Sequence, residues 1–209
     1  MEKGFNLIKN KYLAKKLAII LISIALVLQT VEYVFTSIYI GFSYEDLFAF
    51  VFEIIVTSML IFALIQKKPV LVEIALIVLK VVEGTYYPLK SCERIDELIY
   101  LGGENFNIAT HVFFTIASFS LLVALVFFCI YKYKNKIKYW DMMKTSVLVA
   151  SFFMFVSAII YIIDTVVVGE SNWEEVLEPI ALTVLFLGMF MTYEFVEEET
   201  IYNEETSAS

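Results

Sequence analysis

The chain has 209 residues, of which 60% are hydrophobic and only 18% charged, and its formal net charge is −8. Soluble domains average about 45–50% apolar and 25% charged residues, and a chain of this size has too much surface for its volume to bury so many apolar side chains in one water-soluble core. These values exclude an ordinary soluble enzyme, a disordered protein and a nucleic-acid-binding protein, and they predict a polytopic membrane protein in contact with the lipid bilayer.

Apolar runs separated by charged residues predict six transmembrane helices, each near the roughly 20 residues that an α-helix needs to cross a bilayer. In chain order the predicted spans are 17–40, 46–66, 69–87, 107–131, 145–168 and 175–195. The first run is too long for the apolar core of a signal peptide and lacks a small-residue cleavage site, so we expect it to remain in the mature protein. The predicted fold is all-α, a six-helix transmembrane bundle over 17–195 built of three helical hairpins.

The positions of lysine and arginine predict the orientation of the bundle. Of the 15 basic residues, 12 lie in segment 1–16 or in the links that follow the second and fourth spans. The positive-inside rule therefore places both termini in the cytoplasm and the protein in the cell membrane. This divides the chain into a basic N-terminal segment (1–16), the membrane domain (17–195) and an acidic tail (196–209) that we expect to be disordered.

Two segments next to the spans also have helical patterns. Residues 5–13 place apolar side chains near one helical face among lysines, which is typical of a helix on an anionic leaflet, although a plain basic flank has the same composition. In the longest outer loop, Ser91 is positioned to cap a short helix over 91–101, which the following glycines would end. We expect that helix to lie over the mouth of the bundle, either as packing or as a lid.

Polar and ionisable side chains within the spans are the candidate ligand-binding residues, because a charge inside a bilayer costs at least about 2.5 kcal/mol. Most of them fall at one depth, in the outer third of the odd-numbered spans or in the first turns of the even-numbered ones. The candidates are Gln29, Glu32, Glu53, Lys80, Glu83, His111, Asp164 and Glu178. Since polar faces should point into the bundle, they predict an acidic pocket that is open to the outer face.

The leading hypothesis is that this pocket binds or passes a small cationic solute. The acids that would supply the negative charge are Glu32, Glu53, Glu83 and Asp164. His111 would make the site sensitive to pH near neutrality. Lys80 would balance Glu83, which lies three residues further along the same helix.

Several of these residues also have a structural explanation. Asp164 and Glu178 lie near a span boundary, where they can reach headgroups and water. His111 can hydrogen-bond a neighbouring helix. Glu73, near the cytoplasmic end of its span, is expected to pair with Lys67 or Lys68.

The sequence contains none of the common catalytic motifs, and one histidine with two cysteines cannot supply a four-ligand zinc site. We therefore expect no enzymatic activity, metal or cofactor. The three prolines all lie at span ends, which predicts unbroken helices rather than the interrupted helices of many transporters. Aromatic residues at interface depth, Trp140 and Tyr193 among them, predict an aromatic belt.

Ala14 and Ala18 form an Ala-x-x-x-Ala motif at the start of the first span. Together with six spans, both ends inside and a ligand pocket near the outer face, this layout resembles the substrate-binding subunits of energy-coupling-factor vitamin importers. In that family the motif contacts a partner membrane subunit, so the resemblance implies such a partner here. The alternative to solute binding is thus a non-catalytic accessory or assembly subunit, whose intramembrane acids pair with basic residues of another chain or of a second copy.

Overall fold

The computed structural model describes residues 10–39, 44–101, 105–168 and 173–207 of the chain, which form six α-helices and no strand within those ranges. The helices are α1 (Lys11–Tyr39), α2 (Tyr44–Ile65), α3 (Pro69–Leu101), α4 (Asn105–Lys134), α5 (Ile137–Val168) and α6 (Trp173–Ser207). The all-helical class predicted from the sequence is therefore confirmed.

Five helices contain a segment that is long and apolar enough to cross a membrane. These segments are Tyr12–Ile38, Leu47–Ile65, Ile108–Lys134, Ile137–Val167 and Val176–Val196. The remaining helix, α3, has 33 residues but carries Glu73, Lys80 and Glu83 among its apolar side chains. The helices thus support a multi-pass membrane protein, while a sixth span through α3 stays a prediction.

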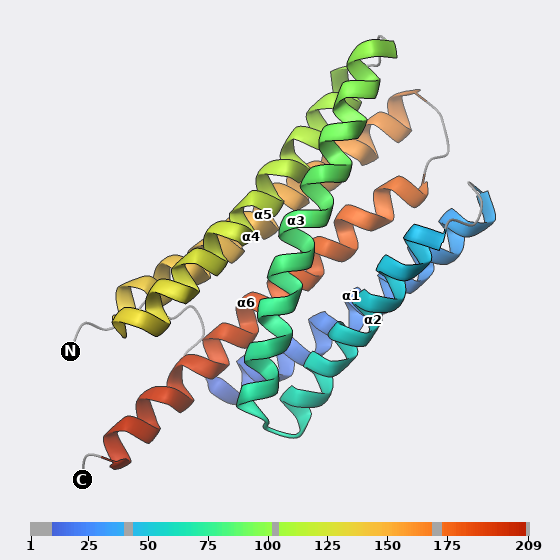
Figure 1. The fold of residues 1–209 in the computed structure, drawn as a ribbon. Helices are drawn as coiled ribbons and strands as arrows, with labels where there is room; N and C mark the ends of the chain where they lie inside the picture. The colour runs from blue at the N-terminus through green and yellow to red at the C-terminus, as the bar shows by residue number, and fades with distance from the viewer. Residues whose placement is uncertain (1–9, 40–43, 102–104, 169–172, 208–209) are drawn as a thin grey trace.

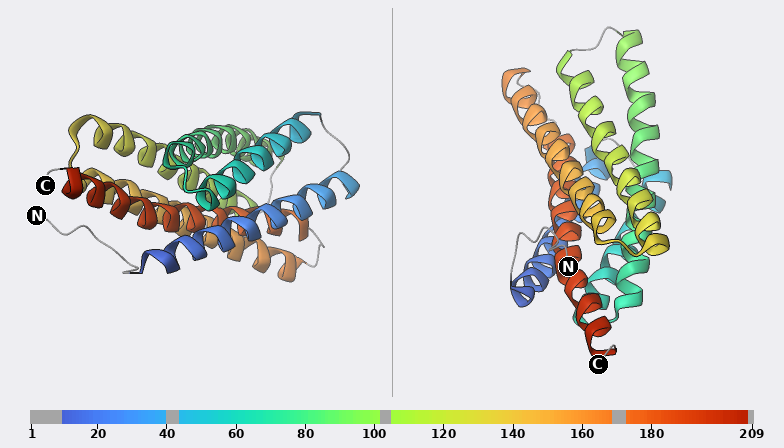
Figure 2. Two further views of the ribbon diagram at one scale, coloured as in Figure 1. Left: turned by 90° about the horizontal axis from the view of Figure 1, so that it is seen from below. Right: turned by 90° about the vertical axis from the view of Figure 1, so that its left-hand side faces the viewer.

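The contacts between the helices form a closed ring. Each helix packs against the next one in sequence, and α1 also packs along α6 (Figures 1 and 2). We call the end where α1 begins and α6 ends the proximal end, and the end where α1, α3 and α5 finish the distal end. α6 is the most deeply buried of the five apolar spans. From their short link at the proximal end, α2 and α3 diverge toward the distal end (Figure 1).

Two helices that begin at the proximal end, α1 and α5, start earlier than the predicted spans. Asn10 caps α1, since its Oδ1 accepts hydrogen bonds from the backbone N–H groups of Tyr12 at 3.1 Å and Leu13 at 3.3 Å. α5 begins at Ile137 and not near residue 145. Lysine is a good helix former, so a basic segment marks the edge of the membrane without ending the helix.

Two further expectations differ from the structure. Pro88 does not end α3, which continues to Leu101, so the predicted separate helix over 91–101 lying across the bundle mouth is wrong. α6 continues to Ser207 through the tail that we expected to be disordered, because glutamate favours the helix and extending an existing helix needs no new nucleus. Most of the predicted amphipathic segment 5–13 lies outside the described residues.

α1 and α6 approach each other closely at a glycine. A Cβ atom on Gly188 would lie 2.6 Å from Cγ1 of Ile22 and 3.2 Å from its backbone nitrogen, so only glycine fits there without displacement. On the same face of α1, Ala14 and Ala18 are fully buried in the bundle of this chain. The partner surface that the importer resemblance implied at these alanines is therefore not exposed.

Candidate functional site

Three helices bring an amide and two carboxyl groups together in the distal half of the bundle. Gln29 of α1 donates a hydrogen bond from Nε2 to Oε2 of Glu53 on α2, at 3.3 Å. The carboxyl of Glu83 on α3 interacts electrostatically with Glu53 and with the half-buried Glu178 of α6. Gln29, Glu53 and Glu83 are 5%, 7% and 0% exposed. We call Gln29, Glu53, Glu83 and Glu178 the carboxyl cluster.

The carboxyl cluster contains polar atoms that the bundle leaves without hydrogen bonds. Both oxygens of Glu83 and Oε1 of Gln29 are buried and accept no hydrogen bond from a basic, amide or hydroxyl group in the described part of the chain. The Glu83 carboxyl lies against that of Glu53, and the two can share a hydrogen bond when one of them is protonated. An unsatisfied buried polar group costs about 1–3 kcal/mol, and a charged one costs more. These three acceptors are therefore the atoms of the cluster at which a ligand would gain most.

Apolar periodicity explains why these polar residues are buried. On α3, Leu76 and Leu79 precede Glu83 at a spacing of seven and four residues, which places all three on one buried face. On α1, Gln29 lies one turn beyond the buried Ala25. Gln29 and Glu83 are therefore buried because they lie on the same helix faces as the apolar side chains that form the core of the bundle.

The other predicted site residues make contacts on their own helices or across α4 and α5. Glu32 is half-buried and accepts a hydrogen bond from the Thr36 hydroxyl at 2.9 Å. Nε2 of His111 lies 3.5 Å from the Tyr161 hydroxyl. Asp164 is half-buried, and its Oδ1 has no hydrogen-bond partner among the described residues. These contacts do not involve the carboxyl cluster, so a pocket uniting all the acids stays a prediction.

Lys80 does not balance Glu83, contrary to our expectation. Lys80 is fully buried, and its Nζ lies 4.5 Å from the ring centroid of Phe128 and 5.2 Å from that of Tyr193. Its Nζ has no hydrogen-bond partner in the described residues, and Glu73 is the carboxylate with which it interacts electrostatically. A long side chain on a helix leans toward the helix N-terminus, which carries this ammonium away from Glu83.

Glu73 itself forms a different ion pair from the predicted one. Its Oε1 lies 2.7 Å from Nζ of Lys132 on α4, whereas we expected Lys67 or Lys68. Both side chains of the pair remain partly exposed at the proximal end. The prediction considered only residues close in sequence, while the packing of α3 on α4 supplies the partner.

Sequence reasoning missed a buried ion pair in the proximal half. Nζ of Lys144 on α5 lies 3.2 Å from Oε1 of Glu194 on α6, with both side chains at most 1% exposed, and Asp141 lies 3.5 Å from the same ammonium. Lys144 had been assigned to a cytoplasmic link. The sequence feature that could have predicted this ion pair is Glu194, an acidic residue between apolar and aromatic residues at the end of the last predicted span.

Two aromatic residues assigned to the membrane belt belong to the core instead. Trp140 and Tyr193 are 4% and 1% exposed, and their rings meet edge to face with centroids 5.6 Å apart. The Tyr193 ring also covers Lys80. Depth along a helix predicted an interface position for both, but depth alone does not say which side of the helix faces lipid.

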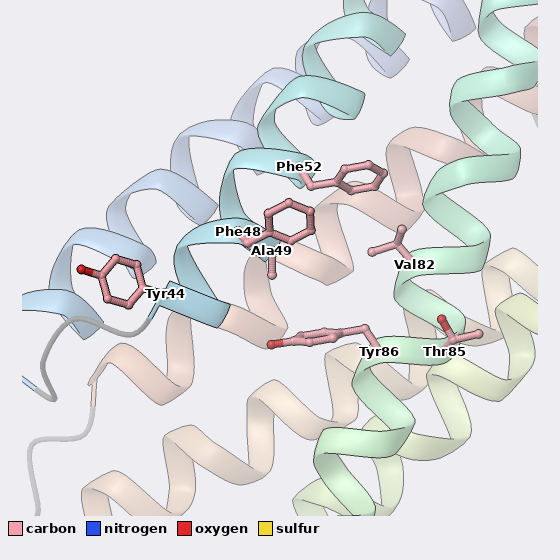
Figure 3. A pocket seen from close by; sticks show the side chains of 7 residues that line it. All are labelled: Tyr44, Phe48, Ala49, Phe52, Val82, Thr85 and Tyr86. Carbon is pink, nitrogen blue, oxygen red and sulfur yellow. The ribbon is translucent and has the colours of Figure 1, made fainter.

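An open groove of about 600 Å³ lies between α2 and α3 (Figure 3). The residues that line the groove are Tyr44, Phe48, Ala49, Phe52, Val82, Thr85 and Tyr86. We call it the aromatic groove. Ala49 lies one turn before Glu53 on α2, and Tyr86 lies one turn beyond Glu83 on α3. The groove therefore lies on the turns of α2 and α3 next to those that carry the two carboxyls, although no residue of the cluster lines it.

Comparison of the chain with protein-family models, with curated proteins and with solved structures found no match. Among the residues that the structure describes, no group of three or more His, Cys, Asp and Glu is arranged to hold a metal ion. A function is therefore inferred from the chemistry of the site.

Proposed function

We propose that the chain is a non-enzymatic integral membrane protein that binds or passes a small cation at the carboxyl cluster, from a pocket open to the outer face. The helices with membrane-spanning length support the location in a bilayer. The observation that carries the proposal is the fully buried Glu83, whose carboxyl lies against that of Glu53 and accepts no hydrogen bond from a basic, amide or hydroxyl group of the described chain.

The electrostatics of this arrangement favour a positively charged ligand. Two carboxylates side by side in a low-dielectric interior repel each other, so a proton or a cation is needed to neutralise them. Oε1 of Gln29 adds a third acceptor without adding charge. An ammonium group has three N–H donors and no acceptor, so its chemistry matches the three unsatisfied acceptors.

The position of the carboxyls favours solute binding over the accessory-subunit alternative. Glu53 and Glu83 are buried by the helices of this chain, so they are less accessible to a basic residue of a partner helix than the half-buried Glu32 is. Glu32 is the half-buried acid at which the alternative would place its partner. A second chain that co-purifies with the wild type and is lost on Glu32→Gln substitution would support the alternative.

The test is cation binding by the protein in lipid nanodiscs, measured by calorimetry. The probes are sodium, methylammonium, guanidinium and tetramethylammonium chlorides. We expect at least one to bind, and Glu83→Gln to weaken that binding by tenfold or more, which corresponds to about 1.4 kcal/mol. The matched control is Glu73→Gln, which removes an acid from the same helix outside the carboxyl cluster.

The proposal fails if none of the four cations binds to the wild type. It also fails if Glu83→Gln binds them as tightly as the wild type does, or if Glu73→Gln has the same effect as Glu83→Gln. Thermal unfolding of each variant in the same nanodiscs confirms that it is folded before its binding is compared.

A further inference from the structure

We infer that the carboxyl cluster takes an amphiphilic amine, whose apolar body occupies the aromatic groove and whose ammonium reaches Glu83 and Gln29 from the lipid side, between α2 and α3. This inference rests on the proposed function for the cation site. It names the class of cation, and it replaces the approach from the outer face by an approach from the lipid side. Two independent features support it: a groove beside the site, and unsatisfied acceptors inside the site.

The shape of the aromatic groove suits an aromatic or short alkyl body. Phe48 and Phe52 of α2 and Tyr86 of α3 project into the space between the two helices (Figure 3). Its volume of about 600 Å³ lies within the ~300–1,000 Å³ range of small-molecule sites. Val82 and Thr85 of α3 also line the groove. The Thr85 hydroxyl already donates a hydrogen bond to the carbonyl oxygen of Val81 at 2.6 Å, so Thr85 offers the ligand an apolar contact.

The polar end of the ligand would meet the carboxyls one helical turn from the groove. Ala49 and Tyr86 line the groove, and each lies one helical turn from a carboxyl of the cluster, Glu53 and Glu83 respectively. Alanine is the smallest of the lining side chains and leaves the approach to Glu53 least obstructed. A ligand with a charged end and an apolar body therefore has complementary surroundings at both ends.

The groove opens on the side of the bundle that the membrane covers. Phe48 and Tyr44 at its rim are 75% and 82% exposed, and Phe48 lies in an apolar segment long enough to span a bilayer. An amphiphilic amine concentrates at the membrane interface with its apolar body among the acyl chains. Entry from the lipid side brings that body into the groove first and the ammonium to the carboxyls last.

The experiment compares 2-phenylethylammonium with methylammonium, which carries the same ammonium without the aromatic body. Binding to the protein in nanodiscs is measured for both amines, and uptake that persists in Glu83→Gln is subtracted as partitioning into lipid. We expect 2-phenylethylammonium to bind at least tenfold more tightly than methylammonium. Thr85→Trp, which fills the groove, should abolish this difference.

A matched pair of phenylalanines provides the control. Phe48→Ala removes an exposed aromatic side chain from the aromatic groove and should weaken 2-phenylethylammonium binding by about two- to tenfold. Phe119→Ala removes an exposed phenylalanine from a second groove, of about 380 Å³ between α4 and α5, and should have no effect.

The outcomes separate this inference from the proposed function. If methylammonium binds in a Glu83-dependent way but 2-phenylethylammonium binds no better, or if Phe48→Ala and Phe119→Ala act alike, the inference is wrong and the proposed function stands. If neither amine nor any of the other cations binds, the proposed function fails, and the inference fails with it.

Discussion

The buried ion pair between Lys144 and Glu194 should contribute far more to stability than the shorter, exposed pair between Lys132 and Glu73. The N–O distances are 3.2 Å for the buried pair and 2.7 Å for the exposed one. Distance alone would predict that the exposed pair contributes more to stability than the buried pair. Burial reverses the order, because removal of one partner of a buried pair leaves an uncompensated charge with no access to water.

The expected magnitudes follow from the surroundings of each ammonium. Lys144→Met removes the partner of a carboxylate that is 0% exposed and should lower the free energy of unfolding by about 3–5 kcal/mol. Glu194→Gln should cost about 3 kcal/mol, at the lower end of that range, because Asp141 remains 3.5 Å from the ammonium. Lys132→Met should cost only about 0–1 kcal/mol, since its side chain is 48% exposed.

Unfolding of the purified protein in one lipid–detergent mixture, titrated with a denaturing detergent, measures these differences. Trp140 is a suitable fluorescent probe, because its ring packs against Tyr193, the residue before Glu194. The double variant Lys144→Met/Glu194→Leu removes both charges and should recover most of the lost stability. Equal losses for Lys144→Met and Lys132→Met would refute the reasoning, as would a double variant no more stable than the single ones.

The remaining predictions use the same unfolding assay. Lys80→Met should leave stability within about 1 kcal/mol of the wild type or raise it, because the buried Nζ has ring contacts but no hydrogen bond in the described chain; a loss above about 3 kcal/mol would contradict this. Gly188→Ala should cost about 1–3 kcal/mol, because the new methyl group would press on the backbone of α1 at Ile22. Gly84→Ala should cost less, because its closest neighbour is the end of the Leu122 side chain, which can move; the reverse order would show that backbone contact does not decide the effect.

The helical class and the location of the apolar segments were predictable, because both depend on local composition. A run of apolar residues near 20 in length has few stable alternatives to a helix in a bilayer. Gln29, Glu53 and Glu83 were named from the sequence as candidate ligand-binding residues because each interrupts an apolar run, and their binding of a ligand stays a prediction. Their shared depth along the helices was enough to suggest that they meet.

Contacts between distant helices were not predictable from one sequence. Glu73 was assigned a neighbour in sequence, but the packing of α3 on α4 gives it Lys132. Lys144 was read as part of a link because basic residues mark the membrane boundary, yet α5 had already begun and carries it into the bundle. The aromatic groove depends on how far α2 and α3 diverge, which no local pattern records.

The packing of α1 on α6 has a consequence for how the chain assembles. α1 contacts α6 more extensively than it contacts α2, although α6 is the farthest from it in sequence among the six described helices. α4 and α5 are adjacent in sequence and pack extensively, so this hairpin forms from local contacts as soon as both helices exist. α1 enters the membrane first but reaches its main partner last. Until then its small-residue face, with Ala14 and Ala18, lacks the helix that covers it in the full bundle and is open to other helices.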